Sequence, residues 1–289
     1  MLLREVEWWL GETLVRATLA QPEGSPPSLG VALAHGAMLN RFSLLREGLS
    51  LGGLLCEYLG AIVVAPSLRG EAHTFQDLTE IFSSACRFLA EELGVARVVA
   101  FGHSLGGFVA AHSLPCNPHL DALVAYGTPV AEFNRRLGGL LDYLVQYLSQ
   151  YQYPLDMRNL LPLIFSRETH AFLTQTILKD PQYRPQTIDL RLNPHTLQNP
   201  STLATTYLPK LQQWGHPTLI LLGTQDKITQ KTLKAYPHNH REGPVLFQHL
   251  HGATHITPCL NNPKLHTLLP PITRFTARLQ TLETPARGE

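Results

Sequence analysis

The sequence has few charged residues and no long apolar run, and each shortage excludes a class of protein. Charged side chains make up 16% of the 289 residues and the net charge is +1, so no basic surface favours nucleic acid. No stretch approaches the ~18 apolar residues of a membrane-spanning helix, so we expect no stable membrane insertion. Hydrophobic residues make up 44%, which is typical of a folded globular chain.

Cysteines are few as well, and none of them lies in a CxxC pair. Such scattered cysteines favour reduced thiols over a disulfide framework or a zinc site. The first twelve residues, MLLREVEWWLGE, carry charges inside their apolar stretch and lack the apolar centre of a signal peptide. We therefore expect a cytoplasmic protein. The four cysteines are Cys56, Cys86, Cys116 and Cys259.

The sequence does contain short apolar strands that alternate with helical stretches. Such alternation implies parallel strands joined by right-handed crossovers. We therefore expect an α/β fold, with a mostly parallel central sheet flanked by helices. The predicted elements are an antiparallel pair within 5–20, turning at Gly11-Glu12, then strands at 29–36, 61–66, 95–101, 120–129, 217–226 and 243–252, and helices at 42–59, 75–93, after Ser104 and after Pro263.

The alternation lapses between residue 130 and about residue 210. An interruption of about 80 residues is longer than a loop of a compact domain, so it predicts a folded insertion. We expect a core domain formed by 1–130 and 211–289, and a helical cap or lid at 131–210. An apolar helical stripe from Leu137 to Leu148 either packs on the core or lines an apolar pocket, and the pattern alone leaves both open.

A single serine stands where a buried strand meets a helix, in the stretch VVAFGHSLGGFVAAH at 98–112. Residues 102–106 fit G-x-S-x-G, the sharp turn that exposes a nucleophilic serine. Side chains at Gly102 or Gly106 would collide with the neighbouring backbone in so tight a turn. The free N–H groups of the following helix point to where negative charge would develop. Ser104 is therefore the candidate nucleophile, and the alternative is a capping serine in an ordinary turn.

A serine hydroxyl needs a base to take its proton and a carboxylate to orient that base. On a parallel sheet such groups gather at the carboxyl ends of the strands. Asp226 directly follows one predicted strand, and His255 follows another by a short turn. Singly, Asp226 could be a turn residue and His255 a loop imidazole. Together, in the order Ser104, Asp226, His255, they predict a catalytic triad.

Five short segments, which extend over nearly the whole chain, resemble the α/β-hydrolase superfamily. The resemblance implies a serine hydrolase of the esterase or lipase kind. It also implies that the backbone N–H groups of Ala37 and Leu105 form an oxyanion hole, and that the insertion is the family's cap. Ser67 departs from the pattern, because many relatives carry Asp there, at a position that is usually structural. The segments are HGAM at 35–38, APSLRG at 65–70, GHSLGG at 102–107, GTQDKIT at 223–229 and GATHIT at 252–257.

The predicted reaction is hydrolysis of carboxylic esters with apolar acyl chains, through an acyl-enzyme on Ser104. The expected partner is a small apolar ester lying against Met38, Leu144 and Ile256. No metal or organic cofactor is required. His249, His251 and His255 form H-x-H-x3-H, but the acidic ligand of the usual hydrolytic metal motifs is missing, so we predict no metal site.

Other reactions remain open on the same triad: thioester hydrolysis, C–C bond hydrolysis, acyl transfer and cofactor-free haloperoxidation. A different class also remains open, a non-catalytic binding protein of the same fold. We expect His35 and His103 to form hydrogen bonds near the site rather than to react. The oligomeric state is not predicted.

Overall fold

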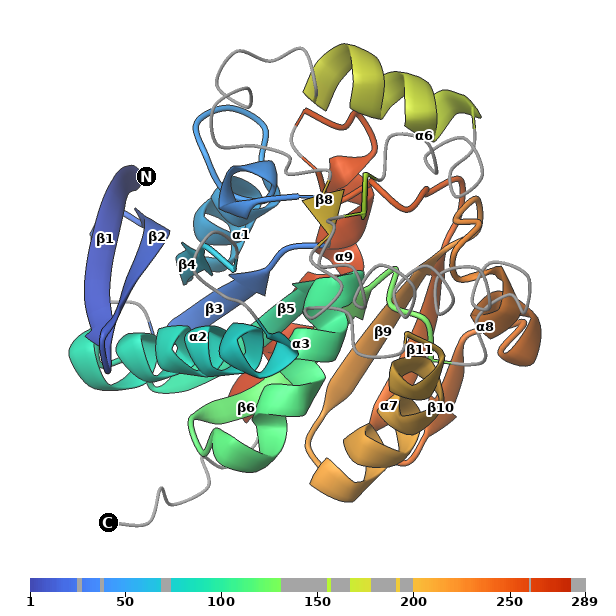
Figure 1. Ribbon diagram of the computed structural model, residues 1–289. Helices are drawn as coiled ribbons and strands as arrows, with labels where there is room; N and C mark the ends of the chain where they lie inside the picture. The colour runs from blue at the N-terminus through green and yellow to red at the C-terminus, as the bar shows by residue number, and fades with distance from the viewer. Residues whose placement is uncertain are drawn as a thin grey trace.

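A sheet runs through the described part of the chain, and helices cover both of its faces (Figure 1). The computed structural model describes residues 1–24, 28–36, 39–68, 74–130, 155–156, 167–177, 191–192, 200–259 and 261–281. Nine strands of these residues form the sheet, in the order β1-β2-β4-β3-β5-β6-β9-β11-β10. They are β1 (Leu2–Leu10), β2 (Thr13–Gln21), β3 (Leu29–Ala34), β4 (Ile62–Pro66), β5 (Arg97–His103), β6 (Leu120–Tyr126), β9 (Thr218–Gly223), β10 (His240–Glu242) and β11 (Val245–Leu250).

The central strands pair in parallel, as the alternation of strands and helices predicts. β4, β3, β5, β6, β9 and β11 form the parallel part, while β1, β2 and β10 pair antiparallel at the two edges. The predicted hairpin between β1 and β2 is confirmed: Leu10 pairs with Thr13, and Gly11 takes the left-handed φ of 59° that a two-residue turn requires. The mostly parallel α/β fold is therefore confirmed.

Two apolar cores lie on the two faces of the sheet, because its central strands are buried on both sides. On one face, Phe82 of α2 (Phe75–Arg87) and Val109 of α3 (Leu105–Ser113) share a cluster with Leu211 of α7 (Pro200–Trp214). On the other, Leu55 of α1 (Leu51–Leu59) shares a cluster with Phe275 of α9 (Leu269–Thr281). Figure 1 shows the sheet between these two helical layers.

The helix predicted over 42–59 is wrong in its first half. A single 3-10 turn covers Arg41–Ser43, and α1 begins only at Leu51. Gly48 has a φ of 90°, which a helix does not allow, and the Ser50 hydroxyl accepts a hydrogen bond from the Gly53 N–H at 3.2 Å. The serine therefore caps a new helix at this point.

The helices predicted at 75–93, after Ser104 and after Pro263 are present, and α8 (Gln230–Ala235) is an additional helix. Thr74 and Asp77 form a capping box at the start of α2, which ends in a π-helical turn over Phe88–Glu92. α3 ends in a 3-10 turn that contains Pro115. α8 follows β9, and a 3-10 turn at Leu265–Leu268 leads into α9.

Most of the predicted cap lies outside the described residues, including the Leu137–Leu148 stripe. Its described parts are the short pair β7 (Leu155–Asp156) and β8 (Arg191–Leu192), residues 200–210 of α7, and α6 (Arg167–Phe172), which runs into a π-helical turn at Leu173–Ile177. The predicted boundary at residue 210 falls inside α7, whose Tyr207 and Leu211 are both buried in the core. The rest of the domain division stays a prediction.

One arginine joins the edge hairpin to the loop after β3. The Arg41 guanidinium donates to Glu5 Oε2 at 2.6 Å, to Thr18 Oγ1 at 3.2 Å, and to the Ser67 hydroxyl. Its Cζ atom lies 4.4 Å from the centre of the Phe42 ring. Ser67 thus has a structural role here, because it accepts a hydrogen bond from Arg41. The carboxylate that pairs with Arg41 comes from Glu5.

Three of the four cysteines have described side chains, and all three are free and buried: Cys56, Cys86 and Cys259. Burial raises the pKa of the Cys56 thiol to about 11 and that of Cys86 to about 12, so both stay protonated at neutral pH. Within the described ranges, no helix combines the length and apolar character needed to cross a membrane.

Substituting Ser50→Ala should lower the free energy of unfolding by about 1 kcal/mol, because it removes the cap of α1. The measurement is urea denaturation of the variant beside Ser83→Ala, a partly exposed serine within α2, which should change stability by less than about 0.5 kcal/mol. Equal losses in the two variants would contradict the capping role.

Candidate active site

The turn at Ser104 joins β5 to α3 with an unusual backbone. Ser104 has φ 54° and ψ −117°, a conformation that residues with a side chain rarely adopt. A Cβ at Gly106 would lie 2.1 Å from the Ala34 carbonyl oxygen, and one at Gly102 would lie 2.4 Å from Gly107 Cα. The turn therefore requires glycine at both positions, for the steric reason predicted.

Three hydrogen bonds hold the Ser104 backbone in place. Its N–H donates to the Tyr126 carbonyl at 2.9 Å, and its own carbonyl accepts from the Thr128 hydroxyl and the Gly107 N–H, both at 3.0 Å. Tyr126 and Thr128 lie at and just after the end of β6, the strand beside β5. The neighbouring strand thus stabilises the strained turn.

Asp226 and His255 form a buried hydrogen-bonded pair. Asp226 Oδ2 lies 2.9 Å from His255 Nδ1, and Asp226 Oδ1 accepts the Ile228 N–H at 2.9 Å. The Asp226 side chain is fully buried and that of His255 is 5% exposed. Because the carboxylate accepts a hydrogen bond from Nδ1–H, the neutral ring carries its lone pair on Nε2.

Gly127 explains why the pair fits beside the sheet. It has a φ of 64°, and a Cβ there would lie 3.0 Å from His255 Nδ1 and 3.2 Å from Asp226 Oδ2. A side chain at this position would be strained at that φ and would force both members of the pair to shift. This glycine follows β6 directly, so it belongs to the same strand end that holds the Ser104 turn.

His103 places His255 beside the Ser104 turn. The two histidine rings lie with centroids 5.0 Å apart, and His103 Nε2 lies 2.7 Å from the His255 carbonyl oxygen. His103 is the residue before Ser104, so the serine, the imidazole and its carboxylate lie at the same end of the strands. That end is the carboxyl end of β5, β9 and β11 (Figure 1).

The loop after β3 also reaches the serine. A Cβ at Gly36 would lie 3.3 Å from Ser104 Cβ. His35 Nδ1 donates to the Gly36 carbonyl at 2.9 Å, and His35 Nε2 accepts the Leu68 N–H at 3.4 Å. His35 therefore holds this loop, which agrees with the hydrogen-bonding role expected for it. The tautomer is set by its two partners.

The predicted oxyanion donors are only partly within the description. Leu105 is the first residue of α3, so its N–H has no acceptor inside the helix. Ala37 and the pocket residues Met38 and Leu144 lie outside the described residues. Ile256, the remaining pocket residue, directly follows His255 and is 3% exposed. These roles stay predictions.

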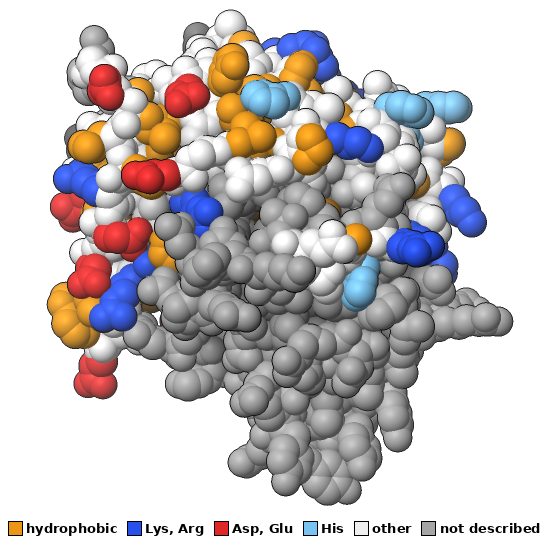
Figure 2. Space-filling model, turned by 90° about the horizontal axis from the view of Figure 1, so that it is seen from above, with side chains coloured by type: hydrophobic (Ala, Val, Ile, Leu, Met, Phe, Trp, Pro, Cys, Tyr) orange, Lys and Arg blue, Asp and Glu red, His pale blue; other side chains and the backbone are white. Residues whose placement is uncertain are grey.

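On the face that Figure 2 shows, the described surface carries no large area of one charge. Acidic and basic side chains lie mixed along the side that carries β1 and β2, and basic side chains and histidines lie on the opposite side. Within the part of the chain that the structure describes, no group of three or more His, Cys, Asp or Glu could hold a metal ion. His255 of the H-x-H-x3-H run is bonded to Asp226 instead.

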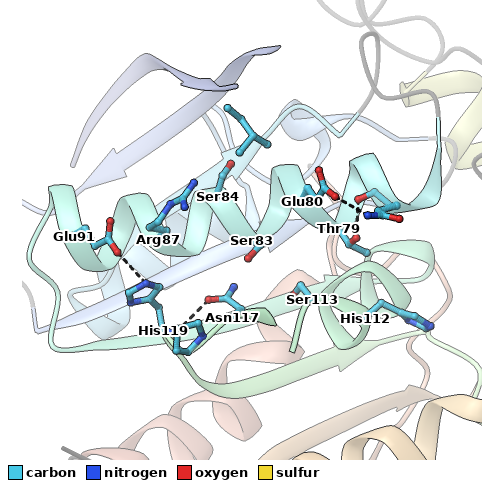
Figure 3. Close-up of a pocket in the computed structure, with 13 residues that line it drawn as sticks. Thr79, Glu80, Ser83, Ser84, Arg87, Glu91, His112, Ser113, Asn117 and His119 are labelled. Carbon is cyan, nitrogen blue, oxygen red and sulfur yellow. Dashed lines mark hydrogen bonds and ion pairs between the residues drawn. The ribbon is translucent and has the colours of Figure 1, made fainter. Parts of the chain in front are cut away.

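A groove of about 620 Å³ lies away from these residues, between α2 and the turn before β6 (Figure 3). His119 in that turn forms an ion pair with Glu91 at 3.0 Å. Asp121, a further buried carboxylate, lies at this amino end of β6 and accepts the Val98 N–H at 2.7 Å. None of the predicted site residues lines the groove, so it is not the candidate active site.

Sequence reasoning missed the contribution of β6, whose end supplies Tyr126, Gly127 and Thr128. The segment YGTP directly after a buried strand was the available signal, because it marks a strand end beside the serine turn. Their contacts depend on side-chain directions across two strands, which periodicity does not give.

Comparisons with known proteins agree with the fold described above. A family model described as the alpha/beta hydrolase family matches residues 31–265. No curated protein matches the sequence. Several solved structures are similar at 15–18% identity, a level at which the likeness shows the fold alone.

Three of these structures illustrate the likeness. An esterase from Thermogutta terrifontis with bound malate has a TM-score of 0.65 at 18% identity, over 96% of this chain and 100% of its own. A carboxyl esterase from Bacillus coagulans in complex with glycerol has 0.62 at 15%, over 97% of each chain. A 2-hydroxy-6-oxo-6-phenylhexa-2,4-dienoate hydrolase from Rhodococcus has 0.61 at 17%, over 95% of this chain and 99% of its own.

The free energy of unfolding should decrease as the pH is lowered, because His103 is buried in its neutral form. Burial first, and then the neighbouring His255 and His35, hold the pKa of His103 well below its usual range. In the unfolded chain the same imidazole titrates near ~6.5, so below that pH the unfolded state binds the extra proton and is favoured. The stabilisation is present above that pH and declines at up to about 1.4 kcal/mol per pH unit below it.

The measurement is the free energy of unfolding between pH 5 and pH 8 for the wild type and His103→Gln. The variant should show the smaller slope, because it removes one titrating group. The pKa of His112 is also lowered, chiefly by burial, so some slope should persist in both proteins. Identical slopes would contradict this account, because they would show that folding does not shift the pKa of His103.

Proposed function

The chain belongs to the α/β-hydrolase family, and from this premise we propose that it is a serine hydrolase that cleaves carboxylic esters of apolar acyl chains. The hydrogen bond between His255 Nδ1 and Asp226 Oδ2 is the observation that carries the proposal. An imidazole so oriented by a buried carboxylate is suited to accept a serine proton. Ser104, which is strained and partly exposed, directly follows His103, whose ring centroid lies 5.0 Å from that of His255.

In the proposed mechanism, Ser104 Oγ attacks the ester carbonyl carbon while its proton passes to His255 Nε2. The N–H groups of Ala37 and Leu105 stabilise the oxyanion, each by ~3 kcal/mol. The tetrahedral intermediate collapses, and His255 gives its proton to the departing alkoxide, which leaves as the alcohol.

The second half of the reaction releases the acid. A water molecule gives a proton to His255 and its hydroxide adds to the acyl-enzyme carbonyl. The bond to Ser104 then breaks, and the proton returns from His255 to the serine oxygen. Asp226 stays ionised throughout and stabilises the imidazolium. Neither step requires a metal or an organic cofactor.

Ester hydrolysis is favoured over the other reactions because esterases are prominent among the similar structures. C–C bond hydrolysis is the second candidate, and the structural similarity to the dienoate hydrolase supports it. The large apolar residues of the predicted cap favour an apolar acyl group in either case. A serine nucleophile is compatible with both reactions.

Ser104→Ala should remove ester turnover, by about 10⁶-fold in kcat, because no other group replaces the nucleophile. The measurement is hydrolysis of p-nitrophenyl esters, with covalent labelling by a fluorophosphonate as a second readout. The matched control is Ser83→Ala, which should be labelled and turned over like the wild type. Turnover that survives Ser104→Ala would end the proposal.

A series of esters with increasingly long acyl chains tests whether the cap binds the acyl group. Each buried CH₂ contributes ~0.8 kcal/mol, so kcat/KM should rise from acetate to medium-chain esters if the transition state realises that gain. Leu144→Gln should flatten the rise, whereas Leu2→Gln, at an exposed position of β1, should not. A wild-type profile that falls steadily from acetate would assign the cap's apolar stripe to packing alone.

A further inference from the structure

The backbone around His255 is held by three side chains from elsewhere in the chain. Tyr126 Oη donates to the Thr254 carbonyl at 2.5 Å, and His103 Nε2 donates to the His255 carbonyl at 2.7 Å. Asn262 Nδ2 donates to the Ile256 carbonyl at 3.1 Å. Three consecutive carbonyl oxygens, at positions 254, 255 and 256, therefore each accept a side-chain hydrogen bond.

This support matters because the segment belongs to neither a helix nor a strand. It is a series of turns, in which the Thr257 N–H donates to the Thr254 carbonyl at 3.1 Å and the Cys259 N–H to the Ile256 carbonyl at 3.0 Å. Without a ladder of regular hydrogen bonds, side-chain donors add to these turns in fixing the path of the backbone. The position of the His255 ring follows from that path.

Two of the three donors come from the strand ends beside the serine. His103 and Tyr126 are directly paired across β5 and β6, and Ser104 follows His103 in the chain. Their rings lie with centroids 6.0 Å apart. The same two strand ends therefore hold the serine turn and the backbone of the imidazole, which couples the two positions.

A packing role alone does not account for His103. Its ring is 1% exposed, and because a carbonyl only accepts, its Nε2 carries the proton. Nδ1 then carries a lone pair and has no hydrogen-bond partner among the described residues. A buried polar atom without a partner is destabilising, and an apolar side chain of similar size would avoid this cost. The donor at Nε2 is the feature that an apolar residue lacks.

We propose that His103 and Tyr126 are positioning residues that hold His255 where it can accept the Ser104 proton. The inference rests on the proposed function, because it assigns a role within that reaction. Both act on the backbone of the His255 segment and not on the substrate. Loss of either donor should therefore lower kcat and leave KM nearly unchanged.

The test compares variants that lose a donor with one that keeps it. His103→Leu and Tyr126→Phe each remove a donor to the segment, whereas Gln in His103→Gln can place its Nε2 near the position of the imidazole Nε2. The control is His112→Leu, which removes a half-buried histidine bonded to the Phe108 carbonyl at 2.8 Å within α3, remote from His255. Thermal melts confirm that each variant is folded.

The readouts are kcat and KM for a p-nitrophenyl ester and the rate of fluorophosphonate labelling. His103→Leu and Tyr126→Phe should lower kcat about 10- to 100-fold with KM within about twofold, because a displacement near 1 Å can cost about 100-fold. His103→Gln should stay within about threefold of the wild type, and His112→Leu should match it. The labelling rates should follow kcat.

Each outcome decides the matter. Folded His103→Leu with wild-type kcat would overturn the positioning role, as would a His103→Gln variant as slow as His103→Leu. If His103→Leu does not fold, Tyr126→Phe decides, since it removes a single oxygen atom. A wild type that neither turns over esters nor reacts with the fluorophosphonate would overturn the proposed function and this role with it, whereas an active wild type with unaffected variants would overturn this role alone.

Discussion

The backbone of Ser104 is held in a conformation that a serine adopts only under constraint, at φ 54° and ψ −117°. Such a residue costs of order 1–3 kcal/mol, which the surrounding packing must offset. Close contacts supply that constraint: the backbone after β3 touches Gly106, and Thr128 Oγ1 occupies the space where a Gly107 side chain would lie. Glycines at these positions therefore allow the neighbouring segments to pack closely against the turn. This packing holds the turn in the conformation that exposes the Ser104 hydroxyl.

The parallel sheet explains how residues far apart in sequence meet at this turn. β5, β6, β9 and β11 are consecutive in the sheet, and all four point the same way. Four residues therefore lie together beyond the carboxyl ends of these strands: Ser104, Gly127, Asp226 and His255. Groups placed on short segments beyond a rigid sheet need further support, which the hydrogen bonds of Asp226 and Tyr126 provide.

Part of this arrangement could be predicted from the sequence, because strands and tight turns leave local signals. The parallel sheet and the strand ends at Ser104, Asp226 and His255 follow from apolar runs that end in glycine or polar residues. The start of α1 did not follow, since residues 42–50 contain the apolar spacing of a helix and Ser50 resembles any other polar position. The contacts of His103 depend on which strand lies next to β5, and that information is not local.

The central claim is that Asp226 holds His255 in the tautomer that accepts the serine proton. Asp226→Asn tests it most directly, because an amide at this position favours the wrong tautomer while keeping the shape. The measurement is kcat of Asp226→Asn. The control is Asp121→Asn, because Asp121 carries a buried carboxylate at the amino end of β6. The account predicts a loss of about 10⁴-fold for Asp226→Asn and little change for Asp121→Asn. Near wild-type turnover in Asp226→Asn, or a larger loss in Asp121→Asn, would contradict it.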